Sequence, residues 1–152
     1  MSIEDLSTQE LEEKFENFLF NMDDYLEQLT SKASDQGIIL DFSLGSLKEL
    51  ERYIIENNTK QTDDDYNDIS AYLGEVLVQN YGAKWHCNLD NVNNSLYYGF
   101  PVLEGHSGKD VLFSPFHVVK AFILRQKENL FINAIKSQTD PEPIDWSKLP
   151  SE

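Results

Sequence analysis

Three side chains capable of catalytic chemistry lie within residues 71–87, AYLGEVLVQNYGAKWHC: Glu75, His86 and Cys87. A carboxylate with a raised pKa can transfer protons, and a thiolate beside a base can act as a nucleophile. One hypothesis is therefore a small enzyme with a pocket around these three residues. The same stretch is also explained as the joint between a helix that ends at Gly82 and a strand whose side chains alternate between two faces. We favour the joint and predict no catalytic residue.

The histidines and the cysteine are ligand types that zinc accepts. His86 and Cys87 are adjacent, so in a strand they point to opposite faces, and neither CxxC nor HExxH is present. His106 or His117 could serve as a base for Cys87, although a buried, unreactive thiol is the simpler interpretation. The sequence predicts no metal site.

Two polar segments share only part of the pattern of known ligand loops. Residues 105–109, GHSGK, are too short for a phosphate-binding GxxxxGK[ST] loop, and there is no GxSxG elbow. Asp63, Asp64, Asp65 and Asp68 lack the spacing and the glycine of a calcium-binding EF-hand, so we interpret them as a helix start. We predict no cofactor.

Four helices are predicted from apolar residues that recur every three or four positions. The first is long and amphipathic, over residues 8–33, and begins at a capping box formed by Ser7 and Glu10. The others are expected over residues 44–57, 63–80 and 115–136.

Short segments separated by Asn, Gly and Pro follow Gly82 and predict a small antiparallel sheet. Its expected strands are residues 84–88, 95–98, 101–103 and 110–113. Helices first, strands later and a final helix predict an α+β fold in a single domain, residues 1–136. Residues 137–152 hold three of the five prolines and are expected to form an extended or partly disordered acidic tail.

The formal net charge of the chain is −15. Residues 1–76 contain 19 acidic and 5 basic side chains, a net of −14, whereas residues 77–152 contain 8 and 7, a net of −1. Such a chain is repelled by nucleic acid and by anionic membranes, so we expect it to bind neither. The asymmetry serves either solubility or the binding of a basic protein partner.

We assign the expected partner-binding surface to carboxylates on the outer face of the first helix and at the start of the third. These residues are Glu12, Glu13, Glu16, Asp23, Asp24, Glu27, Asp63, Asp64, Asp65 and Asp68. A dense group of carboxylates raises the local concentration of a cationic partner. Four nearby tyrosines could either anchor such a partner or line the edge of the core: Tyr25, Tyr53, Tyr66 and Tyr72.

A cytoplasmic location is expected for three reasons. The single cysteine cannot form an internal disulfide, the N-terminal sequence MSIEDLSTQE lacks a basic or apolar leader, and no apolar run approaches the length of a membrane span.

Four segments together resemble a pattern found in small, uncharacterised bacterial α+β proteins, some of which are immunity proteins that accompany polymorphic toxins. They fall within residues 38–124 and are LDFSLGSLKELERYI, AYLGEVLVQNYGAKW, YYGFPVL and VLFSPFHVV. The resemblance implies a fold and assigns no catalytic residue.

We therefore predict a non-catalytic, cytoplasmic protein-binding protein, an immunity-type inhibitor of a basic toxin domain. Two alternatives remain open. One is the small enzyme with a pocket around Glu75, His86 and Cys87, and the other is an adaptor or regulatory module that self-associates through the edge of its sheet.

Overall fold

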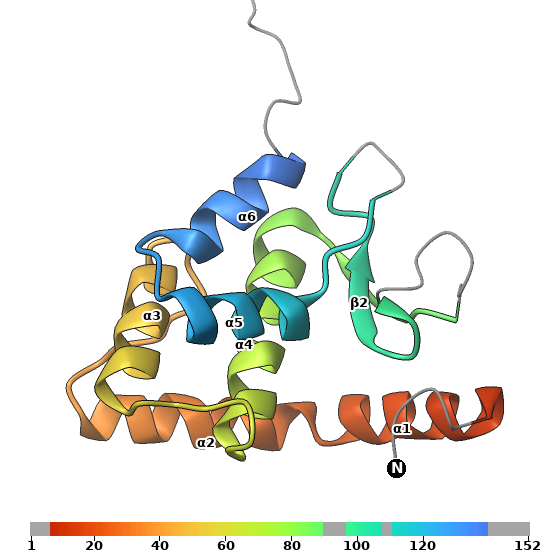
Figure 1. Cartoon of the computed structure of the whole chain (residues 1–152), viewed down its shortest axis with the longest axis horizontal. Helices are drawn as coiled ribbons and strands as arrows, with labels where there is room; N and C mark the ends of the chain where they lie inside the picture. The colour runs from red at the N-terminus through yellow and green to blue at the C-terminus, as the bar shows by residue number, and fades with distance from the viewer. Residues whose placement is uncertain (1–6, 90–96, 108–110, 140–152) are drawn as a thin grey trace, which may run out of the picture.

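The computed structural model of the protein describes residues 7–89, 97–107 and 111–139. Within them, six helices and a two-stranded antiparallel sheet form an α+β arrangement, as the sequence predicts (Figure 1). The helices dominate, and the sheet is a small hairpin beside them.

The first predicted helix consists of two helices, α1 (Thr8–Phe20) and α2 (Met22–Asp35), which lie end to end in Figure 1. The prediction of one helix over residues 8–33 is therefore wrong at Asn21. Its side-chain amide donates a hydrogen bond to the Asn17 carbonyl oxygen (2.8 Å), the same acceptor that its backbone N–H uses (3.0 Å). The backbone of Asn21 departs from regular helix geometry, with φ −93° and ψ 7°. The Asn21 carbonyl oxygen still accepts from the Tyr25 N–H (3.0 Å), so the chain continues without a sharp turn.

Helix α3 (Ser46–Glu56) and helix α4 (Asp65–Tyr81) confirm the next two predicted helices to within two residues at each end. Helix α4 ends where expected, at Gly82, whose φ of 70° is in the left-handed region that glycine adopts at low cost. The N-terminal capping box is also confirmed, since Ser7 and Glu10 each accept a hydrogen bond from the other's backbone N–H.

The sheet is a hairpin of β1 (Lys84–Cys87) and β2 (Pro101–Glu104), with Trp85 opposite Leu103. The strand expected over residues 110–113 is reduced to one bridge, in which Phe113 and Leu103 exchange backbone hydrogen bonds of 3.0 and 2.8 Å. Of the strand expected over residues 95–98, only Tyr97 and Tyr98 are described, and they lie in a turn rather than a strand.

The last predicted helix, residues 115–136, is also two helices, α5 (Pro115–Arg125) and α6 (Leu130–Thr139). The break falls at Gln126 and Asn129, which have φ angles of 51° and 68° and cannot continue a right-handed helix. Helix α6 ends at Thr139, three residues beyond the predicted end of the helix at residue 136, so residues 137–139 are helical rather than extended. The domain boundary stays a prediction. The rest of the predicted tail lies outside the described residues.

A buried carboxylate holds the start of α6. Glu51, on α3 and only 5% exposed, accepts hydrogen bonds from the backbone N–H groups of Asn129 (2.9 Å) and Phe131 (3.0 Å). Two N–H groups that lack partners within the helix are thereby satisfied, and the negative charge lies at the positive end of the helix dipole.

Helix α4 is the centre of the core. It packs against α2 on one side and against α5 on another, and α3 and α6 close the layer (Figure 1). The core includes the fully buried residues Leu29, Leu50, Tyr72, Leu73, Phe122 and Phe131. Each such side chain contributes about 1.5–3 kcal/mol by leaving water.

Candidate functional site

The stretch with three chemically capable side chains is a helix–strand joint, as favoured from the sequence. One Glu75 carboxylate oxygen accepts a hydrogen bond from the Trp85 indole N–H at 2.8 Å. The Trp85 ring lies against Gly74, where a Cβ atom would overlap it, so the glycine is required for this approach. Glu75 therefore serves as the hydrogen-bond partner of Trp85. His86 is exposed on β1.

Cys87 is half-buried and unreactive in character. Burial raises the pKa of its thiol, and the nearby Glu12 carboxylate raises it further, so the thiol stays protonated at neutral pH. Of the two histidines considered as bases, His106 pairs with the Gln138 side chain and His117 with the Ser114 hydroxyl, both at 2.6 Å. In the described part of the chain, no three His, Cys, Asp or Glu side chains are grouped to hold a metal ion.

Six of the ten predicted partner-binding carboxylates are exposed on one side of α1 and α2. With about 100° between successive helix residues, they lie opposite the buried Leu11 of α1 and the buried Leu29 of α2. We call them the acidic face: Glu12, Glu13, Glu16, Asp23, Asp24 and Glu27. The two basic residues of these helices, Lys14 and Lys32, lie nearer the buried side.

An exposed aromatic side chain lies within the acidic face. Phe20, at the end of α1, is 86% exposed, and its neighbour Leu19 is 40% exposed. Glu16 lies one helical turn before Phe20, and Asp23 and Asp24 begin α2 just after it. An apolar ring thus stands among carboxylates at the joint of two helices.

The other predicted carboxylates surround the start of α4 and form a separate group. Asp63 and Asp64 are exposed, whereas Asp65 accepts hydrogen bonds from the Lys32 ammonium (3.0 Å) and the Tyr53 hydroxyl (2.9 Å). Lys32, which holds Asp65, lies about 140° around α2 from Glu27 of the acidic face, given 3.6 residues per turn. The second group therefore does not extend the acidic face.

Asp68 departs from the prediction of an exposed carboxylate, because it is only 3% exposed on the packed side of α4. One of its oxygens, Oδ2, has no hydrogen-bond partner among the described residues. Burial raises the pKa of Asp68 to about 6; the Asp65 and Asp64 carboxylates add to this shift, and the Lys32 ammonium opposes it. An aspartate in this position cannot meet a partner.

The tyrosines considered as anchors also divide into two pairs. Tyr53 and Tyr72 are fully buried, and the Tyr72 hydroxyl bonds Ser46 (2.7 Å) and the Phe42 backbone N–H (2.8 Å). They belong to the core, so of the two interpretations of these tyrosines, the anchor interpretation is wrong for this pair. Tyr25 and Tyr66 are half-buried and line a cavity instead.

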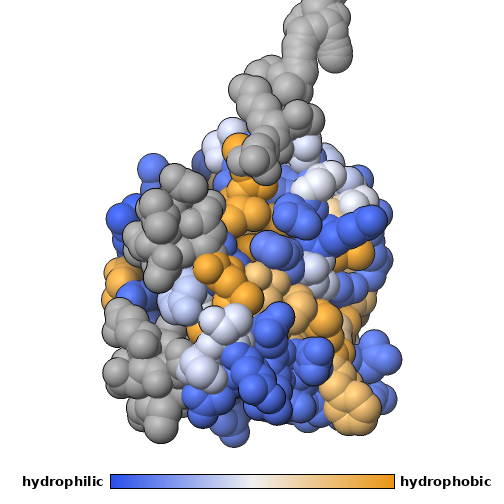
Figure 2. All heavy atoms as spheres, turned by 90° about the vertical axis from the view of Figure 1, so that its right-hand side faces the viewer, coloured by the Kyte–Doolittle hydropathy of each residue, from blue (hydrophilic) through white to orange (hydrophobic). Residues whose placement is uncertain are grey.

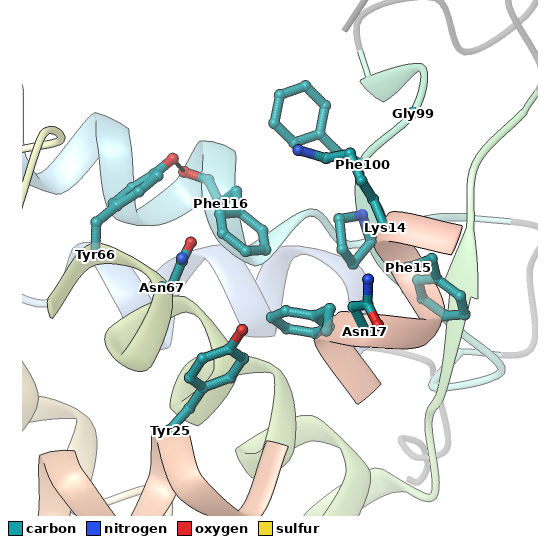
Figure 3. Close-up of a pocket in the computed structure, with 11 residues that line it drawn as sticks. Lys14, Phe15, Asn17, Tyr25, Tyr66, Asn67, Gly99, Phe100 and Phe116 are labelled. Carbon is teal, nitrogen blue, oxygen red and sulfur yellow. Dashed lines mark hydrogen bonds between the residues drawn. The ribbon is translucent and has the colours of Figure 1, made fainter. Parts of the chain in front are cut away.

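This cavity, which we call the aromatic pocket, has a volume of about 380 Å³ and opens between α1, the starts of α4 and α5, and the residues before β2 (Figure 3). Its aromatic walls are Phe15, Phe18, Tyr25, Tyr66, Phe100 and Phe116. Ring centroids lie 5.6 Å apart for Phe18 and Phe116 and 5.5 Å apart for Tyr66 and Phe116. The Tyr66 hydroxyl donates to the Phe116 carbonyl oxygen (2.6 Å), which links α4 to α5.

Figure 2 views the molecule from the right-hand side of Figure 1 and separates the two kinds of surface. Hydrophilic side chains gather along the lower edge, where the N-terminal start of α1 faces the viewer. An apolar strip crosses the face above them. The candidate sites are therefore a charged outer helix face and an aromatic cavity, and neither includes Glu75, His86 or Cys87.

No family model, curated protein or solved structure matches the chain. Among the helices of the described residues, none has the length and apolar character needed to cross a bilayer.

Sequence reasoning missed Phe20 and the aromatic pocket for different reasons. Phe20 was detectable, because it is a large apolar residue about 180° around the helix from Leu11 and hence outside the apolar stripe. The pocket was not, because residues from 14 to 116 reach it only through the tertiary fold.

Proposed function

We propose that the protein is a non-catalytic binding protein whose acidic face receives a basic protein domain, with Phe20 as the apolar anchor. The observation that carries this proposal is an 86% exposed phenylalanine among six exposed carboxylates on α1 and α2. In the form that the resemblance suggests, the partner is a basic toxin domain and the protein is its immunity-type inhibitor, acting in the cytoplasm.

The two parts of this surface have different roles in binding. Carboxylates at the rim of an interface accelerate encounter with a cationic partner and are screened by salt, since the Debye length is about 8 Å at physiological ionic strength. An aromatic side chain that becomes buried holds the complex and slows dissociation. Exposed carboxylates alone would be explained by solubility. An exposed aromatic ring lowers solubility, so the combination of Phe20 with the carboxylates favours a role in binding.

The alternatives gain less support from the described residues. The enzyme requires convergent polar groups in a cavity, whereas Glu75 is bonded to Trp85 and the Cys87 thiol is held protonated. Self-association through the sheet requires a free edge. Phe113 already pairs with the outer side of β2, and α1 packs against β1.

Site-specific photo-cross-linking tests the proposal in the cell that makes the protein. Phe20 is replaced by the photoreactive amino acid p-benzoylphenylalanine, and Leu124 of α5, which is 71% exposed, is replaced in the same way as the control. We expect irradiation to give a discrete adduct with one basic protein at position 20 and none at position 124. Equal adducts at both positions, no adduct at position 20, or an acidic partner would refute the proposal.

Two variants with the same change in net charge then test the electrostatic part with the identified partner. The face variant neutralises three carboxylates of the acidic face: Glu12→Gln, Glu13→Gln and Glu16→Gln. The control variant neutralises three exposed carboxylates elsewhere: Glu56→Gln, Glu104→Gln and Glu128→Gln. Only the face variant should slow association.

A further inference from the structure

The polar ends that line the aromatic pocket come from three helices. Figure 3 shows Lys14 and Asn17 of α1 across the pocket from Asn67 of α4, with the Tyr25 ring of α2 below and its hydroxyl directed toward the opening. Among the described residues, none of these four side chains has a hydrogen bond or ion pair to another group. They are therefore available to a ligand.

The charge of the lining is opposite to that of the chain. The sequence has 27 acidic and 12 basic residues. Among the described residues, however, the pocket lining includes the ammonium group of Lys14 and no carboxylate. A cationic ligand would meet only the like charge of Lys14. An anionic group placed beside Lys14 gains an ion pair and amide donors from Asn17 and Asn67.

The shape of the lining favours a flat ring. Phe18 lies 5.6 Å from both Tyr25 and Phe116, and Phe100 lies 6.2 Å from Phe116, measured between ring centroids. Aromatic pairs at such separations gain more than their buried area alone provides. A volume of about 380 Å³ lies within the usual range of small-molecule sites.

We propose that the aromatic pocket binds a small aromatic carboxylate, with its ring against the open side of the aromatic walls and its carboxylate toward Lys14. This site is independent of the acidic face, because Lys14 and Tyr25 lie on the inner side of α1 and α2. The same chemistry occurs in a free aromatic acid and in the C-terminal phenylalanine of a peptide, and the test separates these sources.

Nuclear magnetic resonance titration of the full chain, labelled with nitrogen-15, provides the test. The probes are phenylacetate, phenethylamine with the same ring and a positive charge, and the peptide Gly-Gly-Gly-Phe with a free carboxylate. We expect phenylacetate, with about ten non-hydrogen atoms, to bind with a Kd of about 1 mM. It should shift the backbone amide signals of Asn67, Gly99 and Phe100, and phenethylamine should bind at least about fivefold more weakly.

The variant Lys14→Met tests the ion pair at an exposed position, where the fold tolerates the change. It should weaken phenylacetate binding about fivefold and remove the preference over phenethylamine. Lys120→Met, which removes an exposed lysine of α5 outside the pocket, is the matched control and should leave both affinities unchanged. Tighter binding of the peptide than of phenylacetate would support the site and assign it to a peptide terminus.

Four results would overturn the proposal. They are no shift up to about 10 mM phenylacetate, equal affinity for the amine, shifts that fall outside the pocket, and an unchanged phenylacetate Kd in Lys14→Met.

Discussion

Truncation of Glu51 should destabilise the protein by removing the support of α6. In the variant Glu51→Ala, the backbone N–H groups of Asn129 and Phe131 lose the carboxylate oxygens that they contact at 2.9 and 3.0 Å. Hydrogen bonds to a charged group contribute about 1.5–3 kcal/mol each, so the loss of two should lower the free energy of unfolding by about 3–6 kcal/mol. Glu51→Gln keeps one acceptor oxygen and should lose about half of that.

Urea unfolding followed by circular dichroism at pH 7 measures this effect. With an m-value of about 2 kcal/mol/M, the midpoint of Glu51→Ala should fall by about 1.5–3 M. Glu56→Ala is the matched control on the same helix, because Glu56 is exposed and its ion pair with Arg52 (2.7 Å) should contribute little to stability. A Glu51→Ala midpoint equal to that of Glu56→Ala would refute the assignment of Glu51 as the support of α6.

Three further predictions concern buried groups. Because folding raises the pKa of Asp68 from 3.8 to about 6, the wild type should lose stability as pH rises from about 4 to above 6. Asp68→Asn should escape this loss and gain roughly 2–3 kcal/mol over wild type across that range. A difference between the two urea midpoints that does not change with pH would contradict the raised pKa of Asp68. Gly74→Ala should destabilise by about 1–3 kcal/mol, because the new Cβ overlaps the Trp85 ring. Gly45→Ala, where the new Cβ makes only an ordinary contact with the Ser43 hydroxyl (3.7 Å), should be neutral or stabilising in the same assay. Equal effects of the two substitutions would disprove the close packing at Gly74. Because burial raises the pKa of the Cys87 thiol, Cys87 should react with iodoacetamide at pH 8 more slowly than free cysteine does. In urea, its reaction rate should reach that of free cysteine. A faster reaction in the folded protein than in urea would contradict the raised pKa.

The helices could be predicted from apolar periodicity, but their interruptions could not. The stripe through Leu11, Phe18, Met22 and Leu29 continues across the break at Asn21, because the two helices remain nearly aligned. The break is a change in the backbone angles of one residue, Asn21, and the spacing of apolar residues carries no signal of it.

The sheet was overpredicted for a different reason. Residues 111–113, VLF, are a short apolar run that is typical of a strand. Among the described residues, only one bridge, between Phe113 and Leu103, forms there. Strand formation depends on whether a partner edge is long enough to pair with it, and β2 is a four-residue strand.

The outer carboxylates of the candidate site could be predicted because they lie opposite an apolar stripe. The environment of Asp68 could not, because α4 is buried on nearly all sides and gives no one-sided pattern from which exposure is inferred. The aromatic pocket depends on contacts between α1, α4 and α5, and no spacing in the sequence encodes them.

The salt dependence of association between the protein and the partner cross-linked at Phe20 tests the central claim most directly. Stopped-flow measurements from about 20 to 300 mM salt should show the association rate of the wild type falling at least about tenfold. The face variant should be slow at low salt and nearly insensitive to salt, while the control variant should behave like the wild type. A wild-type rate that does not change with salt, or an equal loss in both variants, would contradict the account.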